Sequence, residues 1–81
     1  MARPRRPTMF EEFGGRVRAR RLARGLSQEK LGFTAGLHPT YISGVERGVR
    51  NVSLKNIVGI AAALKIDPAE LTKGLRPDPT R

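Results

Sequence analysis

Four polar side chains in one short segment could make hydrogen bonds to another molecule: His38, Thr40, Ser43 and Arg47. The hydroxyl of Thr40 or Ser43 can donate to or accept from a base edge, the threonine methyl suits a thymine methyl, and Arg47 suits guanine or a phosphate. His38 suits a phosphate or base contact and, equally, the N-cap of a helix. Because His38 is the only histidine and the chain has no cysteine, the segment predicts neither a metal site nor a catalytic base.

The segment that carries these side chains has the pattern of two short helices joined by a tight turn. Ser27 suits the N-cap of a helix over residues 28–35. Gly36 suits its end, because glycine adopts positive φ without strain. Pro39 suits the first position of a second helix over residues 39–47. The free amides and the positive dipole end beside Ser27 also predict a phosphate contact there.

The apolar positions indicate how these two helices cross. The side chains predicted to face inward are Leu31, Leu37, Ile42 and Val45. Gly32 leaves room for the close approach that two steeply crossing helices need. The layout is that of a helix-turn-helix, whose second helix enters the major groove of DNA. Gly44 removes a side chain from that helix, which predicts a closer fit of the helix in the groove.

Helical patterns on either side of this pair predict an all-α chain of five helices in one domain. We expect a first helix over residues 9–24, in which Gly14 and Gly15 each weaken the helix by about 0.5–1 kcal/mol. Start signals predict a fourth helix over residues 54–65 and a fifth over residues 68–73. The fourth helix is expected to turn Leu54, Ile57, Val58, Ala61 and Leu64 toward the core, with Ile60 to one side.

The chain is strongly basic, with a formal net charge of +9 and an isoelectric point near 11.5. This charge favours a polyanionic partner, and together with the helix-turn-helix pattern it predicts double-stranded DNA. Residues 1–8 are expected to be a disordered basic arm, either solvated or in contact with phosphates or the minor groove. Residues 76–81 are expected to be a disordered tail. No apolar run suits a membrane span, so we expect a cytoplasmic protein of bacterial or phage origin, associated with the nucleoid.

Three stretches of the chain form a recognisable set. They are Gly-Leu-Ser-Gln-Glu-Lys-Leu from Gly25, Ala-Gly-Leu-His-Pro-Thr-Tyr-Ile-Ser-Gly-Val-Glu-Arg-Gly from Ala35, and Asn-Val-Ser-Leu-Lys-Asn-Ile from Asn51. Together they resemble the phage-repressor-like helix-turn-helix family of the Xre/Cro type. Within it, the chain looks most like small stand-alone regulators such as the controller proteins of restriction–modification systems. The resemblance implies a compact five-helix DNA-binding domain over residues 9–75.

The resemblance also implies roles for several residues. The family places an Arg–Glu bridge between the first and third helices, here Arg21 and Glu46, which we expect to orient the helices. It places a phosphate-binding glutamine at Gln28. The loop after the recognition helix, here Arg50 and Asn51, is expected to contact phosphates.

Two further assignments stay open at this level. Tyr41 either stacks on the sugar–phosphate backbone or covers the core. In the family, the region of the fourth and fifth helices forms a two-fold dimer contact, and we expect Ile66, Leu71 and Leu75 to contribute to it. Core packing would explain the same apolar pattern.

The resulting hypothesis is a sequence-specific transcription regulator that binds a roughly palindromic operator as a homodimer, through the helix over residues 39–47. No cofactor and no small-molecule effector is predicted. An antitoxin with a toxin partner and a nonspecific basic nucleic-acid binder are the alternatives. The sequence shows no paired carboxylates in a cleft, no nucleophile–base set and no phosphate loop, so it does not predict an enzyme.

Overall fold

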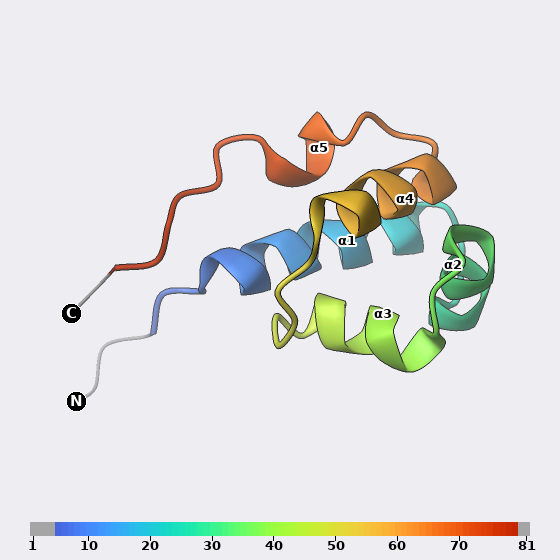
Figure 1. Ribbon diagram of the computed structural model, residues 1–81, viewed down its shortest axis with the longest axis horizontal. Helices are drawn as coiled ribbons and strands as arrows, with labels where there is room; N and C mark the ends of the chain where they lie inside the picture. The colour runs from blue at the N-terminus through green and yellow to red at the C-terminus, as the bar shows by residue number, and fades with distance from the viewer. Residues whose placement is uncertain (1–4, 80–81) are drawn as a thin grey trace.

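The structure, a computed structural model, describes residues 5–79 and contains five helices in this range (Figure 1). They are α1 (Met9–Ala23), α2 (Gln28–Ala35), α3 (Pro39–Glu46), α4 (Leu54–Leu64) and α5 (Ala69–Thr72). The predicted all-α, five-helix fold is confirmed, and the helix ends differ from the expected ones by one residue or none. Within the described range no helix is long and apolar enough to cross a membrane.

Local side-chain contacts start and stop the helices of the helix-turn-helix. The Ser27 hydroxyl accepts a hydrogen bond from the backbone N–H of Lys30 at 2.9 Å, which satisfies an amide that α2 itself leaves unpaired. Gly36 ends α2 with φ +72°, a left-handed conformation that glycine adopts without a Cβ penalty. The Ser53 hydroxyl caps α4 in the same way, accepting from the Asn56 N–H at 3.1 Å.

The described parts of the predicted arm and tail, residues 5–8 and 76–79, make hydrogen bonds to the start of α1. Thr8 and Glu11 cap α1 reciprocally, each accepting a hydrogen bond from the backbone N–H of the other. The Arg5 guanidinium donates to both carboxylate oxygens of Glu11, at 2.8 and 2.9 Å. Asp78 accepts from the Met9 N–H at 2.7 Å. The remaining residues of the predicted arm and tail, 1–4 and 80–81, lie outside the described residues.

These contacts at the start of α1 change the acidity of Glu11. Hydrogen bonds from Arg5 and from the Thr8 N–H favour the charged carboxylate and lower the pKa of Glu11 to about 2. The carboxylate therefore keeps its charge, and its bond to Arg5, through the mildly acidic range.

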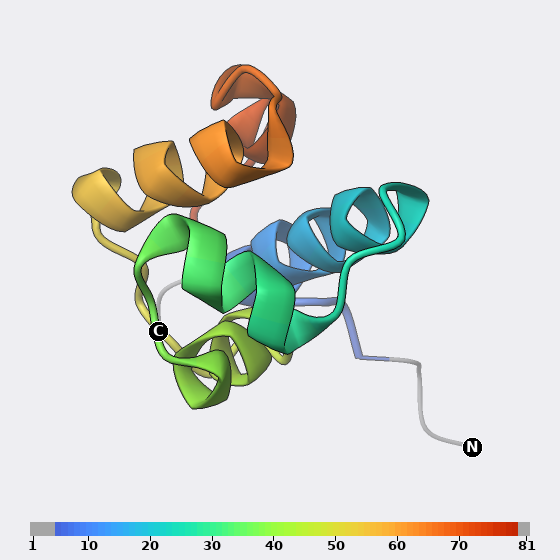
Figure 2. The ribbon, with the colours of Figure 1, turned by 90° about the vertical axis from the view of Figure 1, so that its right-hand side faces the viewer.

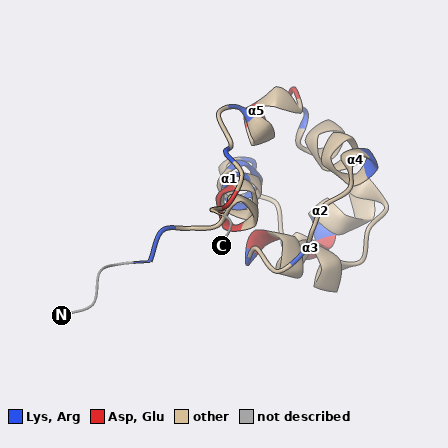
Figure 3. Ribbon diagram, turned by 60° about the vertical axis from the view of Figure 1, so that its left-hand side comes forward, with Lys and Arg blue, Asp and Glu red and all other residues tan. Residues whose placement is uncertain are grey.

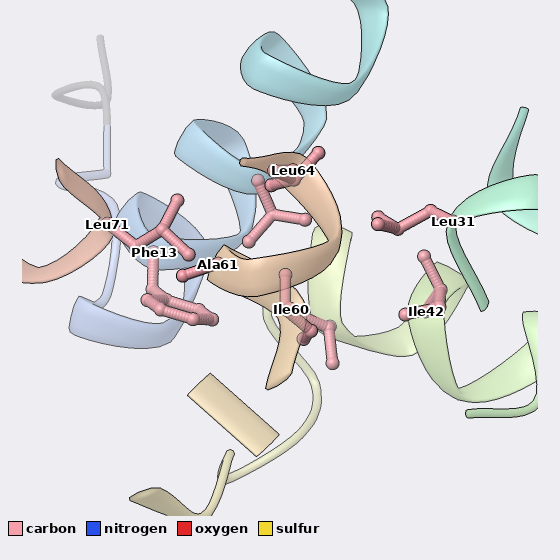
Figure 4. Close-up of a cluster of buried hydrophobic side chains, with 9 residues drawn as sticks. Phe13, Leu31, Ile42, Ile60, Ala61, Leu64 and Leu71 are labelled. Carbon is pink, nitrogen blue, oxygen red and sulfur yellow. The ribbon is translucent and has the colours of Figure 1, made fainter. Parts of the chain in front are cut away.

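The helices surround one apolar core (Figure 4). In Figure 1, α1 lies between α3 on one side and α5 on the other, and Figure 2 shows α2 next to both α3 and α4. Burial of each large apolar side chain contributes about 1.5–3 kcal/mol relative to exposure. The core consists of Phe13, Val17, Leu31, Ile42, Val45, Ile60, Ala61, Leu64 and Leu71.

The buried face of α4 agrees only in part with the predicted one: Ala61 and Leu64 lie in the core as expected, and Ile57 packs against it. Leu54 and Val58, expected in the core, are 76% and 47% exposed, whereas Ile60, expected to one side, is fully buried. Apolar residues cover most of the circumference of α4. The exposed set with Leu54 and Val58 and the buried set with Ile60 and Leu64 therefore both have the spacing of one side of a helix. The contacts with α1 and α2 select the face that contains Ile60, Ala61 and Leu64.

The assignment of Leu71 to a dimer contact is wrong. Its side chain is fully buried in the core of the single chain and presents no surface to a second copy. Ile66 and Leu75 are partly buried and pack against the core, with part of their surface left open.

Helices α1 and α3 come into close contact at Gly14. A Cβ built on Gly14 would lie 2.1 Å from the carbonyl oxygen of Val45 and 2.7 Å from that of Glu46. Both atoms belong to the backbone, so they cannot move aside as a side chain would. The adjacent Gly15 has nothing within 4 Å of the equivalent position. Of these two neighbouring residues, therefore, only Gly14 must be a glycine for α1 to pack against α3.

We predict that Gly14→Ala destabilises the fold by at least about 1–3 kcal/mol, because the two backbones must separate to admit a methyl group. For a domain of this size, the expected decrease in Tm is about 4–8 °C for each kcal/mol. Gly15→Ala is the matched control. It should raise Tm, since alanine is favoured over glycine in an exposed helical position by up to about 1 kcal/mol. Thermal unfolding followed by circular dichroism measures both, and equal effects of the two changes would contradict the role of Gly14.

Candidate nucleic-acid interface

A buried ion pair joins α1 to the end of α3. Arg21 donates from Nε to Oε2 of Glu46 at 2.6 Å and from Nη2 to Oε1 at 3.0 Å. This is the Arg–Glu bridge that the family resemblance implied, in bidentate geometry. The two side chains are only 8% and 3% exposed. Hydrogen bonding from the guanidinium to Glu46 raises the pKa of Arg21 above its ordinary value. A third donor, Nη1, reaches the carbonyl oxygen of Leu26 at 2.8 Å.

The same carboxylate holds the first residue of α2. Gln28 donates from Nε2 to Oε1 of Glu46 at 3.1 Å, which orients the amide at the N-terminus of α2. An amide nitrogen carries two protons, so the second N–H of Gln28 remains for an acceptor outside this contact. Ser27, the N-cap, is exposed beside it. A helix N-terminus with an oriented amide beside it suits an anion such as a phosphate.

His38 serves as the N-cap of α3. Its Nδ1 accepts a hydrogen bond from the Thr40 N–H at 3.0 Å, so in this contact the ring is neutral at Nδ1 and carries its proton on Nε2. Of the two alternatives left open by the sequence, the N-cap is therefore present, and the Nε2–H is free of that bond. Thr40 and Arg47 are exposed, and Ser43 is half-buried.

Tyr41 lies between the core and the surface. Its ring packs against the core, and its hydroxyl accepts a hydrogen bond from Nδ2 of Asn56 on α4 at 3.1 Å. The guanidinium carbon of Arg50 lies 5.7 Å from the centre of the ring, within the range of a cation–π contact. Asn56 was missed by the sequence analysis, because nothing in the local pattern distinguishes it from a surface residue of α4.

The expected role of Gly44 is wrong. The residue is buried, and the nearest atoms to a Cβ built on it are Cγ and Nε of Arg50, at 3.0 and 3.1 Å, followed by a methyl of Val49 at 3.5 Å. The missing side chain thus makes room for the loop that follows α3, and that loop covers Gly44.

Lys and Arg residues are spread along the ribbon rather than gathered at α3, whose residues include none of them (Figure 3). Several arginines of α1 are engaged within the chain, since Arg20 pairs with Glu70 at 2.6 Å and Arg16 donates to the carbonyl oxygen of Lys73 at 2.6 Å. The α1 arginines therefore do not form one stripe that faces a ligand. Among residues 5–79, no group of three or more His, Asp or Glu side chains could hold a metal ion.

A family model described as Helix-turn-helix matches residues 17–71. The chain belongs to the phage-repressor-like helix-turn-helix family of DNA-binding regulators. The match spans α2 and α3 together with most of the core, and it confirms the resemblance that the sequence indicated.

The relatives in sequence include controller proteins. The chain is 55% identical over 60 residues to control protein C.BamHI of Bacillus amyloliquefaciens, which covers 73% of this chain and 74% of the relative. It is 46% identical over 55 residues to control protein C.SmaI of Serratia marcescens, which covers 68% of this chain and 66% of the relative.

Solved structures with the same fold include a controller protein and a phage repressor. The restriction–modification controller protein C.AhdI from Aeromonas hydrophila matches with a TM-score of 0.74 and 56% identity, over 78% of this chain and 94% of that protein. The P22 c2 repressor, solved in complex with a synthetic operator, matches with a TM-score of 0.71 and 34% identity, over 76% of this chain and 94% of the repressor.

We predict that Arg21→Ala lowers the stability of the fold by about 3–5 kcal/mol, because it leaves the Glu46 carboxylate buried without its charge partner. The control is Arg20→Ala, which removes an arginine from the same helix whose partner, Glu70, is about half exposed. A pair of that kind contributes about 0–1 kcal/mol. Chemical denaturation of both variants measures the difference, and an unchanged midpoint for Arg21→Ala would rule out the orienting role of the bridge.

Proposed function

We propose that the chain is a sequence-specific transcription regulator that binds double-stranded DNA as a homodimer, with α3 in the major groove of each half of a roughly palindromic operator. The observation that carries the proposal is the arrangement around Glu46. One buried carboxylate holds the N-terminus of α2 and the end of α3 in a fixed relation to α1. These are the two elements that position a helix-turn-helix on a duplex.

The proposed type of DNA contact for each residue depends on whether the residue lies at α3 or on an element beside it. Exposed or half-exposed polar groups on α3 are proposed to reach base edges, and groups on the flanking elements are proposed to bind phosphates and set the register. The base contacts are His38, Thr40, Ser43 and Arg47. The phosphate contacts are Ser27, Gln28, Tyr41, Arg50 and Asn51. For Tyr41 the hydroxyl proton is the available donor, since its oxygen already accepts from Asn56.

The proposed dimer contact includes an exposed apolar stripe on α4. Leu54, Val58 and Ala62 are four residues apart in sequence, so they lie on one side of the helix, and all three are exposed. The proposal also includes Ile66 and Leu75, which are only partly buried in the single chain. Large apolar side chains gathered in this way mark a surface that is covered in an assembly. A dimer also doubles the number of base pairs that are read.

The similarity to C.BamHI and C.AhdI favours control of a restriction–modification system. In such a role, occupation of the operator depends on dimerisation and hence on the concentration of the regulator. Activation or repression then follows from the position of each operator relative to a promoter. A neighbouring gene for a methyltransferase or an endonuclease would support this role, and a neighbouring toxin gene would support an antitoxin instead.

The test of the function is selection of binding sites from random duplex DNA at about 150 mM salt, followed by an anisotropy titration. We expect a two-fold symmetric site with half-sites about 34 Å apart, bound at least about 10³-fold more tightly than random DNA. Gln28→Ala should weaken binding to this site. A set of enriched sequences without symmetry, and an affinity that collapses with salt, would identify a nonspecific binder instead.

We predict that Val58→Glu makes the protein monomeric and weakens operator binding by about tenfold or more, because a charge cannot be buried unpaired in an apolar contact. Leu22→Glu is the matched control, since Leu22 on α1 is 51% exposed and Val58 is 47% exposed. Sedimentation velocity and the anisotropy titration measure the two effects. If both variants remain dimeric, the contact does not involve this stripe of α4.

A further inference from the structure

The loop after α3 folds back along the helix instead of leading away from it. Gly48 has φ +77°, a left-handed conformation that reverses the chain. The next residue, Val49, donates its N–H to the carbonyl oxygen of Gly44 at 3.0 Å. The side chain of Arg50 therefore begins beside the middle of α3 and not beyond its end.

Two residues of α3 form the surface on which Arg50 lies. Tyr41 and Gly44 are three residues apart, which places them next to each other on one side of the helix. The Arg50 stem passes over Gly44, where a Cβ would lie 3.0 Å from its Cγ and 3.1 Å from its Nε. Its guanidinium carbon is 5.7 Å from the centre of the Tyr41 ring. Arg50 thus has contacts along its whole length even though it is exposed.

The ring beneath the guanidinium is itself held in place. Tyr41 packs against the core on one side, and Asn56 of α4 donates to its hydroxyl at 3.1 Å. The position of Arg50 consequently depends on α3, on α4 and on the loop together. A long side chain loses less conformational entropy on binding when it is already held in one arrangement.

We infer that Gly44 is a positioning residue for the contact between Arg50 and DNA. Its missing side chain lets Arg50 lie along α3 against the face of Tyr41, with the guanidinium directed in advance toward a phosphate or base. The inference rests on the proposed function, in which Arg50 contacts DNA. A Cβ at position 44 would require the Arg50 stem to move by a few tenths of an ångström. We expect this shift to loosen the packing of the guanidinium against the Tyr41 ring.

The test is Gly44→Ala in the full chain, with the selected operator as the DNA. The atoms that the new methyl group meets belong to the flexible side chains of Arg50 and Val49, so the fold can accept it. Alanine is also favoured over glycine in a helix, so Tm should stay unchanged or rise. The operator affinity should nevertheless fall by about two- to tenfold per protomer, the effect of one long side chain that is no longer held. Gly15→Ala, which adds a methyl group in open space on α1, should leave the affinity unchanged.

A double-mutant cycle separates this inference from the proposed function. Arg50→Ala alone should weaken operator binding, and adding Gly44→Ala should then cause no further loss, because the methyl group acts only through Arg50. An equal loss from Gly44→Ala with and without Arg50 would overturn the inference, since the methyl group would then obstruct DNA directly. Full affinity of Gly44→Ala beside a weakened Arg50→Ala would overturn the inference and leave the proposed contact intact. If Arg50→Ala binds the operator with full affinity, Arg50 makes no important contact with DNA and the positioning role of Gly44 is also overturned. The proposed function is tested separately, by whether binding-site selection yields an operator.

Discussion

The orientation of the DNA-binding elements depends on the buried carboxylate of Glu46. It accepts two hydrogen bonds from Arg21 on α1 and one from Gln28 at the start of α2. Because it lies at the end of α3, it joins all three helices at one point. A buried charge is tolerated only where its partners stay in place, so the ion pair specifies one arrangement of these helices more than it adds to stability. The close approach at Gly14, where α1 meets the backbone of α3, makes the same crossing sterically specific.

The net charge of the chain and the candidate DNA contacts serve different purposes. A net charge of +9 draws the protein toward any polyanion over long distances. Many of the cations lie away from α3, and Arg16, Arg20 and Arg21 are engaged with groups of the chain itself. The candidate DNA contacts depend instead on a small set of side chains whose positions are set by caps, by the loop after α3 and by Glu46. Specificity in such a protein therefore comes from geometry and not from the amount of charge.

Helix α4 shows how one apolar segment serves two purposes. Its apolar residues cover more of its circumference than the single chain can bury, so packing against α1 and α2 takes one face and leaves another exposed. The face with Ile60 fills the core, and the face with Leu54 and Val58 remains at the surface. The exposed face is of the kind that an assembly covers. Hydrophobic periodicity correctly predicted the helix and the burial of Ala61 and Leu64, but it placed Leu54 and Val58 in the core and Ile60 to one side.

The features that could be predicted from the sequence are those that act over a few residues. Ser27 and Gly36 start and stop α2 through contacts with their own neighbours, and the spacing between them was sufficient for the helix-turn-helix and its family. The folded chain was needed to show that Leu71 fills the core, that Gly44 lies beneath Arg50, and that Thr8 and Asp78 both bind the start of α1. Each of these depends on contacts with other elements of the fold, and a local pattern of residues does not encode which distant atoms will be nearby.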